Sequence, residues 1–145
     1  MKKQMALCAV IMLAAMGVAR AQGLDPIAVR QAGMALQAGD FAFIRSVVAA
    51  KGDVKPLENP AKAIAKWAAV IPTVFAKGTE TGHDTKALPE VWSDQAGFQK
   101  IAMSLGEAAT KLAVAAKAGD ADEVATDAKL LGDQCAACHK TFRAK

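Results

Sequence analysis

The sequence Cys135-Ala136-Ala137-Cys138-His139 lies near one end of the 145-residue chain. Its spacing, C-x-x-C-H, is the pattern at which c-type haem is attached: two thiols add to the haem vinyl groups and the neighbouring imidazole takes an axial position on iron. On a helix, Cys135 and His139 lie roughly 40° apart around the axis, with Cys138 on the flank of that face. One helical turn can therefore present both sulfurs and the imidazole to a single flat macrocycle.

The same letters have two other interpretations. A redox-active C-x-x-C pair is typical of a βαβ context, and a zinc site needs ligands beyond these three side chains. The pattern of the rest of the chain has to decide between them.

Helical start and stop signals divide the chain into four segments. The first begins at Asp25-Pro26, an N-cap followed by proline at the first helical position, and is closed by Gly52. Within it, Gly33 and Gly39 each disfavour a helix by about 1 kcal/mol relative to alanine. The second segment begins at Asn59-Pro60, and we expect Pro72 to bend it or end it early.

The third segment reads as one continuous helix from Pro89 to Ala118, stopped by Gly119. Asp120 caps the fourth helix at once, so the last two helices are antiparallel neighbours. Residues 76–88 show no periodicity and form a connection that is long for a bundle, so we expect it to be functional or loosely held.

The apolar positions of the fourth helix settle the interpretation of the motif. They form one seam: Val124, Ala128, Leu131, Cys135, His139 and Phe142. Cys135 and His139 should therefore face the interior of a helical bundle, and no strand pattern supports a redox C-x-x-C. We predict an all-α protein in which residues 22–145 form one antiparallel up-down-up-down four-helix bundle with one covalently bound haem c.

Residues 1–21 have the features of a signal peptide. Lys2 and Lys3 precede an apolar run, and Ala19-Arg20-Ala21 resembles a cleavage site. The run is too short to be preferred as a transmembrane anchor, so we expect export to the periplasm without a stable membrane anchor. Removal of Lys2, Lys3 and Arg20 lowers the formal charge from +4 to +1, and no basic patch indicates nucleic-acid binding.

These features together resemble the class II c-type cytochromes, the cytochrome c′ family, including its low-spin methionine-ligated relatives. The resemblance extends over residues 25–145. Its specific matches are Arg30-Gln31 followed by Met34, the segment Gly78-Thr79-Glu80, the segment Val91-Trp92-Ser93-Asp94, and Cys138-His139 followed by Phe142-Arg143.

The resemblance implies roles for individual residues. Cys135 and Cys138 would form the thioether bonds, and His139 would be the axial ligand of the haem iron. Contacts with the haem edge and propionates would come from four residues: Arg30, Gln31, Thr79 and Glu80. Arg143 would lie beside the proximal imidazole, and Met34 would lie on the distal side as a possible sixth ligand.

The family resemblance allows two functions. One is binding of small gases, nitric oxide or carbon monoxide, at a five-coordinate haem, together with one-electron transfer to periplasmic redox partners. The alternative is a low-spin electron carrier in which Met34 ligates iron. A non-haem C-x-x-C oxidoreductase is a third class. We expect no enzymatic activity, and the resemblance also implies a homodimer.

Overall fold

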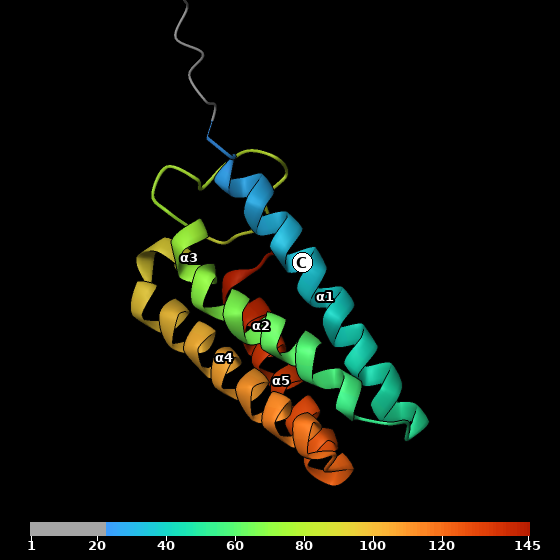
Figure 1. Cartoon of the computed structure of the whole chain (residues 1–145). Coiled ribbons are helices and arrows are strands. Elements are labelled where there is room, and N and C mark those ends of the chain that lie inside the picture. The colour runs from blue at the N-terminus through green and yellow to red at the C-terminus, as the bar shows by residue number, and fades with distance from the viewer. Residues whose placement is uncertain (1–22) are drawn as a thin grey trace, which may run out of the picture.

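The computed structural model describes residues 23–145. Within this range four long helices pack as a bundle, and they are α1 (Pro26–Ala50), α2 (Glu58–Val70), α4 (Gln95–Ala118) and α5 (Ala121–Phe142) (Figure 1). Three short helical segments connect them: η2 (Lys55–Leu57), η3 (Ile71–Val74) and α3 (Glu90–Ser93). The predicted all-α fold is confirmed. The predicted signal peptide, residues 1–21, lies outside the described residues.

The bundle is held by a core that runs along the inner faces of the four long helices and includes η2. Its fully buried large side chains are Ile44, Leu57, Ile64, Leu112, Val124 and Leu131. Burial of each such side chain contributes roughly 1.5–3 kcal/mol relative to exposure, so this row of residues supplies much of the stability. None of the helices in residues 23–145 is both long enough and apolar enough to span a bilayer.

The helix ends were predicted in part. Asp25 caps α1 as expected, since its Oδ1 accepts a hydrogen bond from the Ile27 amide at 2.8 Å. The left-handed residue that closes α1 is Lys51, with φ of 50°, rather than Gly52. The Gly52 amide still donates to the Val47 carbonyl, which satisfies one of the free carbonyl groups at the helix end.

The predicted start of α2 at Asn59-Pro60 is wrong, since the helix begins two residues before Pro60. The chain is already helical at η2, and α2 begins at Glu58 without a side-chain cap. The preceding 3-10 turn supplies the entry to the helix, so the Asn59 cap is not used. Pro72 acts as predicted, because α2 ends at Val70 and the chain tightens into η3.

The prediction of one helix from Pro89 to Ala118 is also wrong. Asp94 has φ of −117° and ψ of 62°, and its side chain accepts a hydrogen bond from the Gly97 amide at 3.0 Å. An aspartate that bonds to a nearby backbone amide competes with helical hydrogen bonding, and here it ends α3 and starts α4. Gly119 and Asp120 then join α4 to α5 as expected.

Candidate functional site

One end of the bundle contains a cavity of about 560 Å³ that is bordered by α1, the 76–88 loop and α5. Seven of the predicted site residues line it: Arg30, Gln31, Met34, Cys135, Cys138, His139 and Arg143. A more open hollow of about 730 Å³ between α2 and α4 is lined mainly by alanine, glycine and a few polar side chains. The chemically distinctive residues therefore converge on the first cavity.

Three phenylalanines make up much of the apolar wall of this cavity. Phe98 lies edge-on between Phe75 and Phe142, with ring centroids 5.0 and 5.1 Å away. Phe75 directly follows η3, and Phe98 and Phe142 lie on α4 and α5, which the bundle brings together at this end. Edge-to-face packing fixes ring orientation, so the wall offers a rigid apolar surface to a flat ligand.

Helix α5 presents the C-x-x-C-H motif to the cavity. Cys135 and Cys138 are free thiols, half-buried and packed against the core. His139 lines the same cavity and is more exposed than the two thiols. The helix turns by about 100° per residue, so His139 and Cys138 cannot both point inward to the same degree.

The local environment changes the acid–base behaviour of these groups. Burial raises the pKa of the Cys138 thiol to about 11, with a smaller contribution from Cys135. Burial also lowers the pKa of His139, and the positive charge of Arg143 acts in the same direction. Arg143 thus neighbours the imidazole electrostatically, and the neutral imidazole, which is the form that binds metals, is favoured.

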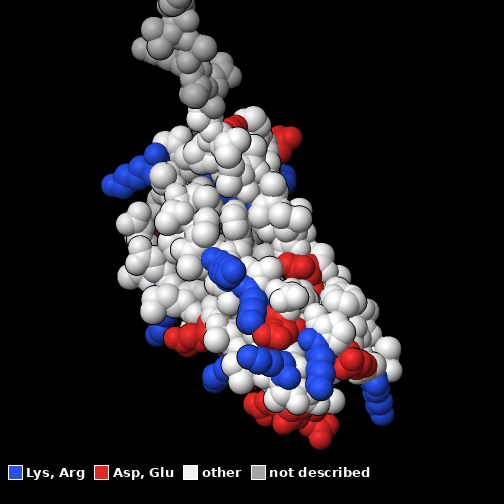
Figure 2. Space-filling view, in the orientation of Figure 1, with Lys and Arg blue, Asp and Glu red and all other residues white. Residues whose placement is uncertain are grey.

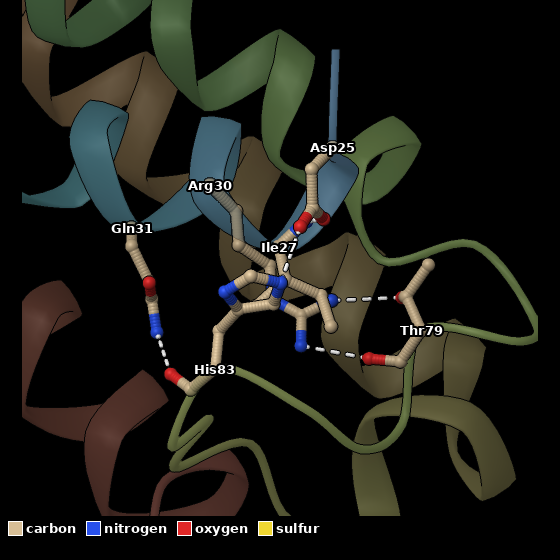
Figure 3. A network of polar contacts seen from close by, with 6 residues as sticks. All are labelled: Asp25, Ile27, Arg30, Gln31, Thr79 and His83. Atoms are coloured by element: carbon tan, nitrogen blue, oxygen red, sulfur yellow. Dashed lines mark hydrogen bonds and ion pairs between the residues drawn. The ribbon is translucent and has the colours of Figure 1, made fainter. Parts of the chain in front are cut away.

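Arg30 on α1 is 2% exposed and fastens the 76–88 loop to the bundle. Its Nη1 donates to Thr79 Oγ1 and its Nη2 to the Thr79 carbonyl, both at 2.8 Å (Figure 3). Nη2 also donates to Thr85 Oγ1 at 2.8 Å, and Nη1 reaches the Val74 carbonyl at 3.5 Å. The guanidinium lies 4.5 Å from the centroid of Phe75, a cation–π arrangement. Its four terminal N–H groups are thus directed at protein acceptors.

A second set of contacts holds the tip of the same loop. Gln31 donates through Nε2 to the His83 carbonyl at 2.7 Å, and His83 Nε2 lies 2.5 Å from Asp25 Oδ2 (Figure 3). His83 and Asp84 adopt φ values of 48° and 51°, in the left-handed region that L-residues rarely occupy. These exposed contacts hold the tip in that conformation, against α1.

Thr79 and Glu80 occupy the loop but are not among the cavity-lining residues. The Thr79 hydroxyl donates to the Ala76 carbonyl at 2.7 Å, and Glu80 Oε1 accepts from the Gly78 amide at 3.0 Å. That hydrogen bond lowers the pKa of the exposed Glu80 carboxyl. The roles that the resemblance implies for Thr79 and Glu80 at a haem edge remain predictions. Their hydrogen bonds in this structure hold the 76–88 loop together and attach it to Arg30.

Sequence reasoning did not identify the residues of the loop that border the cavity. These are Asp84, Thr85, Lys86 and Ala87, and no periodicity marks them. They reach the cavity because the chain pairs with the end of α5: the Ala144 amide donates to the Lys86 carbonyl at 2.8 Å. On the opposite side, Met34, Ala38 and Phe41 project from α1.

The donor set fits a haem group. The cavity combines an apolar wall of aromatic rings with two thiols and an imidazole on one helical turn, and its rim carries Lys86 and Arg143. An amphipathic macrocycle with an apolar ring and a carboxylate edge needs an environment of this kind. A helical bundle with a C-x-x-C-H turn at such a cavity defines a c-type cytochrome.

Comparisons with known proteins agree with this class. The family model described as Cytochrome C' matches residues 25–143. A cytochrome c' from Rubrivivax gelatinosus is 32% identical over 123 residues, which cover 83% of this chain and 95% of the relative. The crystal structure of cytochrome c' from Thermochromatium tepidum has a TM-score of 0.78 at 30% identity and covers 83% of this chain and 95% of that chain.

A further similar structure is a nitric oxide complex of a cytochrome c prime variant from Alcaligenes xylosoxidans. It has a TM-score of 0.75 at 31% identity, covering 83% of this chain and 94% of that chain. The chain belongs to the cytochrome c′ family, and its cofactor is covalently bound haem c.

Proposed function

We propose that this protein binds small diatomic gases, nitric oxide and carbon monoxide, at a five-coordinate haem and can transfer single electrons. When bound, the haem supplies an iron centre that accepts an electron or an axial ligand. The observation that carries the proposal is the arrangement of the cavity: a motif that can hold the iron from one side lies on α5, and the apolar side chains of Met34, Ala38 and Phe41 on α1 lie across from it.

Cys135 and Cys138 would hold the haem through thioether bonds, and His139 would bind the iron. The raised pKa of Cys138 argues against the alternative of a dithiol oxidoreductase, because such enzymes use thiolates stabilised by a lowered pKa. The lowered pKa of His139 supports its role as a neutral ligand at pH 7. Arg143 would keep the imidazole in this form.

The second axial position depends on Met34. This side chain lines the cavity, is half-buried and packs against the hydrophobic core. A flexible thioether can fill space in a core or bind iron. Its packing favours the first role, in which Met34 covers the iron and slows the entry of ligands without binding it.

Optical spectroscopy of the purified protein tests both parts of this proposal. Haem that stays with the polypeptide in acidic acetone supports covalent attachment, and a colourless protein or freely extracted haem contradicts it. The ferric form should be high-spin, and the ferrous form should bind carbon monoxide. Met34→Ala should speed carbon monoxide binding without changing the resting spin state.

The same spectra would also identify methionine ligation. A low-spin resting spectrum that becomes high-spin in Met34→Ala would mean that the Met34 sulfur ligates iron, and the protein would then be an electron carrier. Met103→Ala is a matched control, since Met103 is exposed on α4 and does not line the cavity.

A homodimer is the assembly that the surface of α1 favours. Leu36 and Phe43 are 73% and 47% exposed on this helix. Ala32 and Gly39 lie beside them on the same face of the helix and are also exposed. An apolar helix face of this kind would be covered by a second copy. In the view of Figure 2 most charged side chains lie in the lower half of the molecule, and the upper half shows few of them. Sedimentation of Leu36→Glu/Phe43→Glu should show a monomer where the unmodified protein is a dimer.

Export to the periplasm follows from residues 1–21, as does a mature chain that begins at Gln22. Redox partners would then be periplasmic as well. Cell fractionation with N-terminal sequencing tests this expectation, and haem-containing protein in the cytoplasm with an intact N-terminus would contradict it. We expect no enzymatic activity.

A further inference from the structure

The rim of the haem cavity carries three charged side chains that the family resemblance does not assign to the propionates: Asp84, Lys86 and Arg143. Lys86 and Asp84 are exposed residues of the 76–88 loop. Lys86 takes part in none of the ion pairs found among residues 23–145. Its ammonium group is therefore a cation at the cavity that has no carboxylate partner within the described chain.

The residues expected to bind the haem carboxylates are already engaged. The terminal N–H groups of Arg30 are directed at Thr79, Thr85 and Val74. Gln31 donates to the His83 carbonyl. With Arg30 and Gln31 holding the loop, Lys86 is a further cation at the cavity that is free to pair with a haem carboxylate.

The backbone around Lys86 is held firmly enough for such a role. The Ala144 amide donates to the Lys86 carbonyl at 2.8 Å, and the Leu88 amide donates to the Phe142 carbonyl at 3.0 Å. Ala87 and Arg143 form an antiparallel bridge. The loop is thereby paired with the end of α5, only a few residues beyond His139, so the position of Lys86 is coupled to that of the motif.

We propose that Lys86 is a positioning residue that pairs with a carboxylate of the haem and stabilises the reduced state, while Asp84 on the same rim opposes it. The proposal rests on the haem-binding function proposed above. A carboxylate that is partly removed from water is stabilised by an opposite charge nearby. A positive charge close to the iron also favours the form with one more electron, since Coulomb interactions act more strongly in the low-dielectric cavity than in water.

Reduction potentials of the holoprotein test this assignment. Spectroelectrochemical titration at fixed pH should give a lower potential for Lys86→Gln and a higher potential for Asp84→Asn. Lys86→Arg should restore the unmodified value, because it keeps the charge. Lys117→Gln is the matched control: this lysine lies in the last turn of α4, on a helix end that does not border the cavity, and its loss should leave the potential unchanged.

Two further readouts separate a direct pair from a distant surface charge. The shift in Lys86→Gln should persist when the salt concentration is raised from 0.01 to 1 M, whereas the effect of a remote exposed charge is screened. The resonance Raman bands of the propionate groups, which respond to their hydrogen bonding, should change in Lys86→Gln and not in Lys117→Gln.

The outcomes distinguish this proposal from the one on which it rests. Unchanged potentials and Raman bands in Lys86→Gln, or shifts of equal sign in Lys86→Gln and Asp84→Asn, overturn the role of Lys86 while haem attachment and carbon monoxide binding stand. A shift that disappears at high salt with unchanged Raman bands also overturns it. A mature protein without covalent haem overturns both proposals.

Discussion

Two glycines of α1 should respond in opposite ways to the same substitution. Alanine stabilises a helix by about 1 kcal/mol relative to glycine, wherever the helix has space for a methyl group. A Cβ built on Gly39 has no heavy atom within 4 Å. A Cβ built on Gly33 would overlap the six-membered ring of Trp67. The sequence treats both positions alike, and packing against α2 separates them.

The expected magnitudes follow from these two environments. In the monomer, where no second copy covers this face of α1, Gly39→Ala should stabilise the protein by about 0.5–1 kcal/mol. For a chain of this size that corresponds to a rise of roughly 2–5 °C in the melting temperature. In Gly33→Ala the same gain is offset by overpacking, which costs about 1–3 kcal/mol. Both variants gain the same helix propensity, so the difference of about 1–3 kcal/mol between their free energies of unfolding measures the cost of the overlap with Trp67.

Thermal and denaturant unfolding of the holoprotein, followed by circular dichroism, measures this difference. A double-mutant cycle adds Trp67→Leu, which removes the ring that overlaps the new methyl group, and Gly33→Ala should then become neutral or stabilising. If Gly33→Ala alone proves as stable as Gly39→Ala, the indole moves aside without cost and the packing argument fails. A red-shifted tryptophan emission in Gly33→Ala would reveal such a displacement.

Three further substitutions test the loop, the core and the cofactor. Arg30→Lys keeps the charge but cannot donate as a fork to Thr79 and Thr85, so it should lower the free energy of unfolding by about 2 kcal/mol and speed proteolysis of the 76–88 loop; unchanged cleavage would contradict the clamp. Asp127 is 3% exposed, its Oδ2 has no hydrogen-bond partner, and burial raises the pKa of its carboxyl. The native protein therefore binds the carboxyl proton more tightly than the unfolded chain does, and the free energy of unfolding falls as the pH rises through the native pKa. Asp127→Asn should therefore stabilise the protein by about 1 kcal/mol at pH 7 and lose that advantage near pH 4, and a gain independent of pH would refute this cause. Protein lacking haem, obtained with alanine at both motif cysteines, should melt below the holoprotein because the aromatic wall of the cavity then faces water; equal melting temperatures would refute it.

The sequence by itself determined the helical architecture and the chemistry of the motif. Asp25 and Asp120 mark helix starts through side-chain oxygens that bond to amides two or three residues on, which is a purely local interaction. Gly119 ends α4 with φ of 79°, a conformation that glycine adopts without strain. The C-x-x-C-H spacing is likewise a local property, since five consecutive residues carry it.

Other features depend on contacts between segments that are far apart in the chain, and only the tertiary structure decided them. Lys86 reaches the cavity because its backbone pairs with Ala144, 58 residues further along the chain. Arg30 belongs to a family motif that is visible in the sequence, but its hydrogen-bond partners on the 76–88 loop and at Val74 lie 44–55 residues away. The spacing of apolar residues indicates which face of a helix is buried, but it does not indicate which distant loop covers that face. The shape of the cavity and the burial of its charges therefore emerge only when α1, the loop and α5 come together.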